Sequence, residues 1–307
     1  MTNTQKRIRI LLFFLTIFVI IVGLWEPHAL IFGLQRGSLY ALIALPLALL
    51  LGIMDILNLA HGEFLTVGLY ISYLLFVNLG VDPLVSAIPV FFLLVIIGAI
   101  IYQIAVKRVL GAGHLNQLLL TFGVSMVLIE IVKIIWTTRP RNVYVPYASS
   151  SVTLGDFRIG SYEFLYVILA VAVFLLLRLF LKKTRLGQAI YAVGQNPKGA
   201  EIVGINVKFV YFFVFCLSIG LLGIFAAVML PRISIFPLTG NPFSLKSFAL
   251  VAMAGLGNIG GIMIAGITLG IGEAVIQAIP GYGGWSDLIF FGVLIIVIMA
   301  KNLQEVK

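Results

Sequence analysis

Charged residues are scarce in this chain of 307 residues: Asp, Glu, Lys and Arg make up 10% of it, whereas hydrophobic residues make up 62%. Soluble domains average about 25% charged and about 45–50% apolar residues. The composition therefore excludes an ordinary soluble protein and predicts an all-α integral membrane protein. Because one span takes about 20 residues, this length leaves no room for a separate soluble catalytic domain.

Residues that support metal or nucleophilic chemistry are equally scarce. The single cysteine, Cys216, can form neither an internal disulfide nor a multi-cysteine metal site, and we expect it in the core. His28, His61 and His114 lack the spacing of metal ligands, and no H-E-x-x-H or G-x-S-x-G motif is present. A P-loop is also missing. We therefore expect no enzyme activity, no metal and no cofactor, with any ATP bound by partner subunits.

Long apolar runs predict a bundle of nine to ten spans, with broken or re-entrant helices, in a single transmembrane domain over residues 1–307. The runs cover residues 8–24, 30–53, 62–79, 84–106, 115–136, 162–181, 208–230, 245–256, 259–279 and 283–300. The first run lacks a small-residue cleavage site, so it predicts an extra, uncleaved first helix. The short pair 245–256 and 259–279 forms two crossings or one re-entrant hairpin. Short letter matches between the two halves of the chain are interpreted as chance similarity.

Basic residues favour one side of the membrane, so we interpret the formal charge of +9 as a sign of orientation rather than of nucleic-acid binding. If each run crosses once, twelve basic residues lie on the side of the N-terminus: Lys6, Arg7, Arg9, Lys107, Arg108, Lys182, Lys183, Arg185, Lys198, Lys208, Lys301 and Lys307. Five lie on the other side: Arg139, Arg141, Arg158, Arg232 and Lys246. This bias predicts a plasma-membrane (inner-membrane) protein with both termini and loop 182–207 in the cytoplasm and loop 137–161 outside.

Two interruptions fall where helices would cross the membrane. The first contains Asn58, His61, Gly62 and Glu63, and would place Asp55, Asn58 and Gly62 on one face if it were helical. It is either a solvated cytoplasmic turn or a broken helix that lines a transport pathway. Irregular backbone persists at membrane depth only where it is packed in protein or lines a watery cavity.

The second interruption matches G-x-G-x-x-G, but no strand precedes it, so a dinucleotide site is excluded. Its residues are Gly255, Gly257, Asn258, Gly260 and Gly261, and Asn258 is a good N-cap for the next helix. The glycines either allow close helix packing or belong to the pathway. In the following helix lies the ionisable residue Glu273, which is either a pathway residue or a hydrogen-bonded structural acid.

Small apolar residues recur in loop 182–207 at helical spacing, as in Ala189, Ala192 and Val193. They predict a short helix over residues 187–204 that docks on a partner. The alternative is that this basic loop lies on the anionic membrane surface.

Four segments resemble the permeases of ABC importers for branched-chain amino acids: residues 37–42 (GSLYAL), 58–63 (NLAHGE), 183–206 (KTRLGQAIYAVGQNPKGAEIVGIN) and 246–273. The resemblance implies a complex of two permease subunits, identical or homologous, two cytoplasmic ATPases and an external substrate-binding protein, which works by alternating access. It implies that the loop couples to an ATPase through Gly187, Ala192, Asn196, Ala200, Glu201 and Gly204. The alternative is an ion-coupled secondary transporter or channel for small polar solutes such as urea or amides, coupled through Glu273, Glu63 or His61.

Overall fold

The computed structural model describes residues 27–154, 157–255, 257–288, 290–292 and 295. The predicted first helix 8–24, both chain termini and residues 289, 293, 294 and 296–300 of the predicted run 283–300 lie outside these described residues. So do Lys6, Arg7, Arg9, Lys301 and Lys307, five of the twelve basic residues predicted on the cytoplasmic side.

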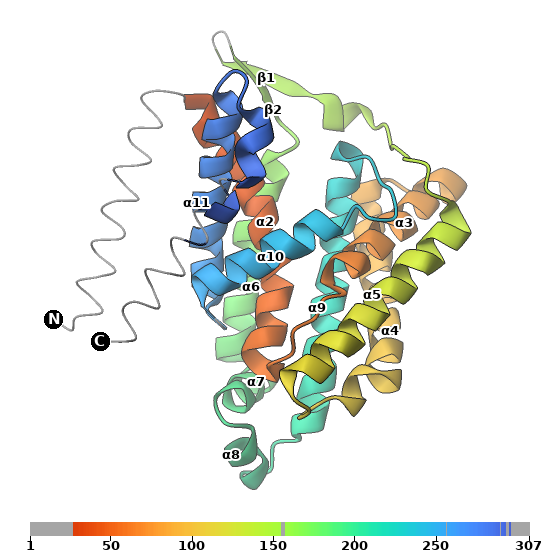
Figure 1. Cartoon of the computed structure of the whole chain (residues 1–307), viewed down its shortest axis with the longest axis vertical. Coiled ribbons are helices and arrows are strands. Elements are labelled where there is room, and N and C mark those ends of the chain that lie inside the picture. Colours follow the sequence, from red (N-terminus) through yellow and green to blue (C-terminus); the bar gives the residue numbers. More distant parts are fainter. Residues whose placement is uncertain (1–26, 155–156, 256, 289, 293–294, 296–307) are drawn as a thin grey trace, which may run out of the picture.

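Helices dominate the described chain (Figure 1). The α-helices are α2 (Pro27–Met54), α3 (His61–Leu79), α4 (Pro83–Ile104), α5 (His114–Trp136), α6 (Phe164–Lys183), α7 (Arg185–Gln195), α8 (Pro197–Ile202), α9 (Val207–Met229), α10 (Asn241–Ala254) and α11 (Ile259–Ala278). Short 3-10 turns are η1 (Val106–Arg108), η2 (Pro146–Ser149), η3 (Leu230–Arg232) and η4 (Gly283–Trp285). The expected all-α membrane bundle is confirmed.

The predicted count of nine to ten spans is not confirmed. Within the described residues, seven helices are long and apolar enough to cross a membrane, namely α2, α3, α4, α5, α6, α9 and α11. The run 245–256 becomes α10, whose 14 residues reach about 21 Å, less than the ~30 Å of a hydrocarbon core. This run is therefore too short to count as a full crossing.

The bundle contains two sets of three helices with opposite directions. Helix α2 packs chiefly against α11, and α4 packs chiefly against α9. In the same way, α3 packs against α9, and α10 packs against α2. In Figure 1, α2 runs toward the end that carries α7 and α8, whereas α9 runs away from it. The order α2–α3–α4 is thus repeated, upside down, by α9–α10–α11.

Glycines allow the closest of these helix contacts. A Cβ atom at Gly37 would lie 2.4 Å from the carbonyl oxygen of Gly266, and one at Gly270 would lie 2.5 Å from the oxygen of Gly33. In the other pair, a Cβ at Gly223 would lie 2.9 Å from the oxygen of Val90. Small residues let backbones approach in this way, and helices α2 and α9 consequently form the buried centre.

A short hairpin interrupts the helical pattern in the predicted external loop 137–161. Strand β1 (Ser151–Leu154) pairs antiparallel with β2 (Phe157–Gly160), a strand pair that the all-α prediction did not include. A backbone bridge between Arg141 and Ile235 ties the loop to the segment after η3. The Tyr147 hydroxyl donates to Asp82 at 2.8 Å, and burial together with this bond raises the pKa of Tyr147. The hairpin and the α7–α8 pair lie at opposite ends of the bundle (Figure 1).

Candidate translocation site and coupling surface

The first interruption folds back into the bundle. Asp55 takes a positive φ of 53°, which ends α2, and α3 begins only at His61. A His61 ring nitrogen lies 2.8 Å from the carbonyl oxygen of Ile43, about halfway along α2. The hydroxyl of Thr121 in α5 forms two hydrogen bonds with the segment between α2 and α3. It accepts from the Leu59 N–H at 3.2 Å and donates to the Leu57 carbonyl oxygen at 2.9 Å. The segment is therefore a broken helix, and the helical face predicted for Asp55, Asn58 and Gly62 is wrong because residues 55–60 are not helical.

Helix α10 begins at the same depth, beside the start of α3. The Gly62 N–H donates to the Ser244 hydroxyl at 2.6 Å, and the Gly240 N–H donates to the Thr66 hydroxyl at 2.9 Å. A Cβ at Gly240 would lie 1.8 Å from the carbonyl oxygen of Gly62. Each helix thus donates a backbone N–H from its start to a hydroxyl of the other helix. Two positive helix ends meet inside the bundle, where they favour negative charge.

Buried polar side chains surround this junction. Asn58, His61 and Glu63 are almost fully buried, and Ser218 of α9 is fully buried. Among the described residues, Asn58 Nδ2, His61 Nδ1, Glu63 Oε2 and Ser218 Oγ have no hydrogen-bond partner. Polar groups at membrane depth are costly and mark candidate pathways for solutes. The junction offers donors and acceptors for a polar solute that crosses the bundle.

The second interruption lies against the last turn of α2, close to Asp55, where the first interruption begins. Gly255 and Gly257 take positive φ values of 90° and 71°. The Asn258 side chain accepts from Gly261 N–H at 3.0 Å, which confirms it as the N-cap of α11. A Cβ at Gly52 would lie 2.5 Å from Gly257 Cα. Leu57 of the first interruption and Ala254 and Met263, which flank the second, pack against the same apolar cluster. That the two interruptions approach each other at a translocation route stays a prediction.

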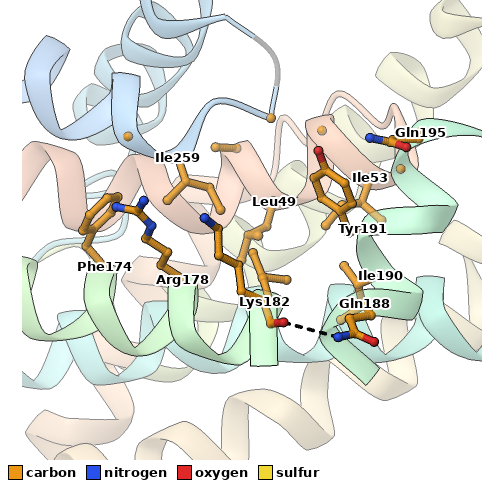
Figure 2. Close-up of a pocket in the computed structure, with 16 residues that line it drawn as sticks. Leu49, Ile53, Phe174, Arg178, Lys182, Gln188, Ile190, Tyr191, Gln195 and Ile259 are labelled. Atoms are coloured by element: carbon orange, nitrogen blue, oxygen red, sulfur yellow. Dashed lines mark hydrogen bonds between the residues drawn. The ribbon is translucent and has the colours of Figure 1, made fainter. Parts of the chain in front are cut away.

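A cavity of about 840 Å³ opens beside this second interruption (Figure 2). Its walls come from the last turns of α2, the second half of α6, α7 and the start of α11. Gly257 and Gly260 belong to its lining. Asn58, His61, Gly62 and Glu63 do not, so the cavity and the α3–α10 junction are separate places in the molecule.

Glu273 belongs to a buried ionic cluster that joins α2, α10 and α11. Its carboxylate lies 3.0 Å from the Lys246 ammonium and 3.6 Å from the Arg36 guanidinium. Lys246 also contacts the Tyr40 hydroxyl at 3.0 Å and Asp287 at 3.1 Å. Lys246 was predicted on the external side, and this side stays a prediction. Its side chain is only 10% exposed because these partners hold it inside the protein.

The predicted coupling loop forms two helices, not the one expected over residues 187–204. Thr184 caps α7 by accepting from Gly187 N–H at 2.9 Å. Asn196 ends α7 and caps α8, accepting from Gly199 N–H at 2.9 Å. Pro197 cannot donate to the preceding turn, so one helix stops and another starts.

The predicted coupling residues divide between two faces of this α7–α8 pair. Gly187 and Ala200 are buried, and Ala192 is half-buried, so they hold the pair against the bundle. A Cβ at Gly187 would lie 2.2 Å from the oxygen of Phe180 in α6. The other three residues are exposed: Asn196, Glu201 and Gly204.

The sequence interpretation included Val203 among the recurring small apolar residues of the loop but missed Ile202 and Tyr191, two large exposed apolar residues of this pair. Ile202 is 86% exposed and Val203 is 75% exposed, and Tyr191 is exposed on α7. The sequence feature that could have revealed Ile202 is its position with Val203 as an apolar pair directly after Glu201, at the end of a helix of only six residues. Such a helix cannot bury every apolar side chain that it carries.

The core position predicted for Cys216 is confirmed, since this residue is buried beside the aromatic contacts of α9. Glu130 and Lys133 form an i, i+3 ion pair at 2.7 Å on α5.

Several known proteins are similar to this chain. The chain is 27% identical to the high-affinity branched-chain amino acid transport system permease protein BraD of Pseudomonas aeruginosa, over 89% of this chain and 92% of BraD. It is 29% identical to the permease protein LivH of Escherichia coli K12, over 87% of this chain and 91% of LivH. A chain in the solved structure of PsaBC from Streptococcus pneumoniae in complex with Fab is 16% identical, with 90% of this chain and 93% of that chain covered and a TM-score of 0.49. Residues 29–299 match the family described as the branched-chain amino acid transport system / permease component, and the chain belongs to this family.

Proposed function

We propose that this protein is the membrane-spanning permease subunit of an ABC importer for branched-chain or closely related amino acids. Family membership over residues 29–299 is the observation that carries the proposal. BraD and LivH, which match most of this chain, are permease proteins of branched-chain amino acid transport systems. The partners in the proposed complex are a second permease subunit, two ATPases that bind the ATP and an external substrate-binding protein.

The α7–α8 pair is the proposed contact with an ATPase subunit. It projects from one end of the bundle (Figure 1), and its outer surface carries Ile202 and Val203 beside Glu201. Gly187 and Ala200 tie the pair to the bundle, so a force applied to α8 reaches α6 and α9. A rigid link of this kind is what a transporter needs in order to convert ATP hydrolysis into helix movement.

The substrate pathway is proposed to pass the α3–α10 junction. Buried Asn58, His61 and Glu63 supply hydrogen-bonding groups there, and Gly62 brings the two helix starts together. Discontinuous helices with inward-facing starts provide substrate sites near the bilayer midplane in other transporters. The pathway role predicted for Gly255, Gly257, Asn258, Gly260, Gly261 and Glu273 stays a prediction.

Substitution of Ile202 by Asp tests the coupling proposal. We expect it to lower substrate-stimulated ATP hydrolysis of the reconstituted complex at least about tenfold, because a charge replaces an apolar contact and tenfold corresponds to about 1.4 kcal/mol. Lys198→Asp, on the same helix but without an apolar side chain to lose, is the matched control. Substrate-stimulated ATP hydrolysis and transport that persist in Ile202→Asp would show that α8 is not the contact that couples the two.

Orientation is a second testable part of the proposal: the α7–α8 end and both termini face the cytoplasm, and the hairpin faces outward. Single cysteines at Val152 and Lys198, in a Cys216→Ala background, occupy exposed positions at the two ends. In intact cells a membrane-impermeant thiol reagent should label position 152 and leave position 198 unlabelled until the cells are opened. Labelling in the reverse order would overturn the orientation.

A further inference from the structure

The cavity between α2, α6, α7 and α11 contains an unusual combination of charge and apolar surface (Figure 2). Its charged lining residues are Arg178 and Lys182, one turn apart on α6. Within the described residues, neither side chain forms an ion pair. Figure 2 shows both side-chain heads projecting from α6 toward the start of α11, near Ile259. The cavity therefore presents two positive charges to whatever occupies it.

Apolar side chains form much of the remaining wall, beside Gln188, Tyr191, Gln195 and four glycines. The apolar side chains are Ala48, Leu49 and Ile53 of α2, Phe174 and Leu181 of α6, Ile190 of α7 and Ile259 of α11. A ligand that suits this lining has an anionic head for the two cations and an apolar chain for the remaining surface. An amino acid is a poor fit, because its ammonium group would find no carboxylate among the lining residues.

The position of the cavity relative to the membrane further restricts the class of ligand that can occupy it. Helix α6 has 20 residues, about the length of the hydrocarbon core, and Lys182 and Lys183 end it at the α7–α8 side. Lys182 therefore lies at the depth of lipid headgroups, and Arg178, four residues or about 6 Å deeper, can extend its long side chain toward them. The outer face of α6 exposes Leu175, Leu176 and Leu179. A lipid in that leaflet can thus reach the cavity along α6.

We propose that this cavity binds an anionic phospholipid, with its phosphate on Arg178 and Lys182 and an acyl chain along Leu49, Ile53 and Phe174. Guanidinium groups bind phosphate through paired hydrogen bonds, and basic pockets between transmembrane helices suit anionic headgroups. The α7 residues Gln188 and Tyr191 also line the cavity, so a bound lipid braces the coupling pair against α2 and α6. The choice of the cytoplasmic leaflet rests on the proposed orientation, whereas the phosphate site does not.

Native mass spectrometry of the full-length chain, titrated with phosphatidylglycerol or phosphatidylcholine, tests this site. We expect phosphatidylglycerol to bind at least about tenfold more tightly than phosphatidylcholine, equivalent to about 1.4 kcal/mol. The double variant Arg178→Gln/Lys182→Gln should lose this preference. The control Lys183→Gln/Arg185→Gln removes the same charge from residues that adjoin α6 but do not line the cavity, and it should keep the preference.

A second variant separates the cavity from general surface charge. Ile53→Trp keeps both cations and fills the apolar part of the cavity, so it should also weaken phosphatidylglycerol binding. Equal losses in the Lys183→Gln/Arg185→Gln control, or full binding by Ile53→Trp, would overturn the proposal. Displacement of the lipid by glycerol 3-phosphate at comparable concentration would instead assign the site to a soluble phosphate and would also refute a lipid ligand.

Discussion

Gly240→Ala is expected to prevent stable folding of the bundle. The added Cβ would lie 1.8 Å from the oxygen and 2.3 Å from the carbonyl carbon of Gly62, and both of these are backbone atoms that cannot rotate away. Overpacking usually costs about 1–3 kcal/mol, and a backbone clash belongs at or above the top of that range. We therefore expect a loss of at least about 3 kcal/mol, seen as a lower thermal midpoint or as aggregation in size-exclusion chromatography.

Two further variants make this test specific. Gly62→Ala disrupts the same contact from the α3 side, because its Cβ would lie 2.2 Å from the Gly240 carbonyl oxygen. It should therefore destabilise the fold as Gly240→Ala does. Gly123→Ala on α5 meets no atom within 4 Å and should be tolerated or slightly stabilising, because alanine favours helix over glycine by about 1 kcal/mol. A Gly240→Ala protein with the midpoint of Gly123→Ala would show that the two helix starts do not meet.

Lys246→Met is expected to destabilise the protein by about 3–5 kcal/mol, the cost of breaking a buried ion pair. The substitution leaves the Glu273 carboxylate 5% exposed, with Arg36 at 3.6 Å as its remaining cation. Thermal unfolding of the purified chain in detergent, followed by intrinsic fluorescence, measures the loss. The corresponding loss in Lys133→Met should stay below about 1 kcal/mol, because the Glu130–Lys133 pair is far more exposed.

The double variant Lys246→Met/Glu273→Met decides whether the cluster is structural. Removing both partners avoids an uncompensated buried charge, so stability should recover by most of the single-variant loss. Arg36 and Asp287 keep exposed side chains and can remain hydrated in this variant. A Lys246→Met protein no less stable than Lys133→Met would contradict the burial of this pair.

Features that depend on a short stretch of sequence were predictable. Apolar runs identified α2, α3, α4, α5, α6, α9 and α11, because a span must bury or expose to lipid about 20 apolar residues in succession. The cap at Asn258 was predictable because it depends on three residues. The motif resemblance agreed with the family that residues 29–299 match.

Features that depend on contacts between distant residues were not predictable. The sequence around Asn58, His61 and Glu63 fits both a solvated turn and a broken helix. The hydrogen bonds of this segment with Ile43 and Thr121 show that it is packed inside the bundle. Lys246 was placed outside by counting membrane crossings, a count that says nothing of whether its side chain is buried in an ionic cluster. Its carboxylate partners come from residues 27 and 41 positions later in the chain, which no local pattern relates to it.

The amino-acid sequence by itself determined that this protein is a helical membrane permease, because hydropathy and local motifs act within single helices. Only the tertiary structure decided that α2–α3–α4 and α9–α10–α11 pack as inverted sets and that the buried starts of α3 and α10 meet at Gly62 and Gly240. That junction depends on the approach of two backbones 178 positions apart in the sequence. Glycine permits such an approach, but a sequence with 31 glycines does not say which two will meet.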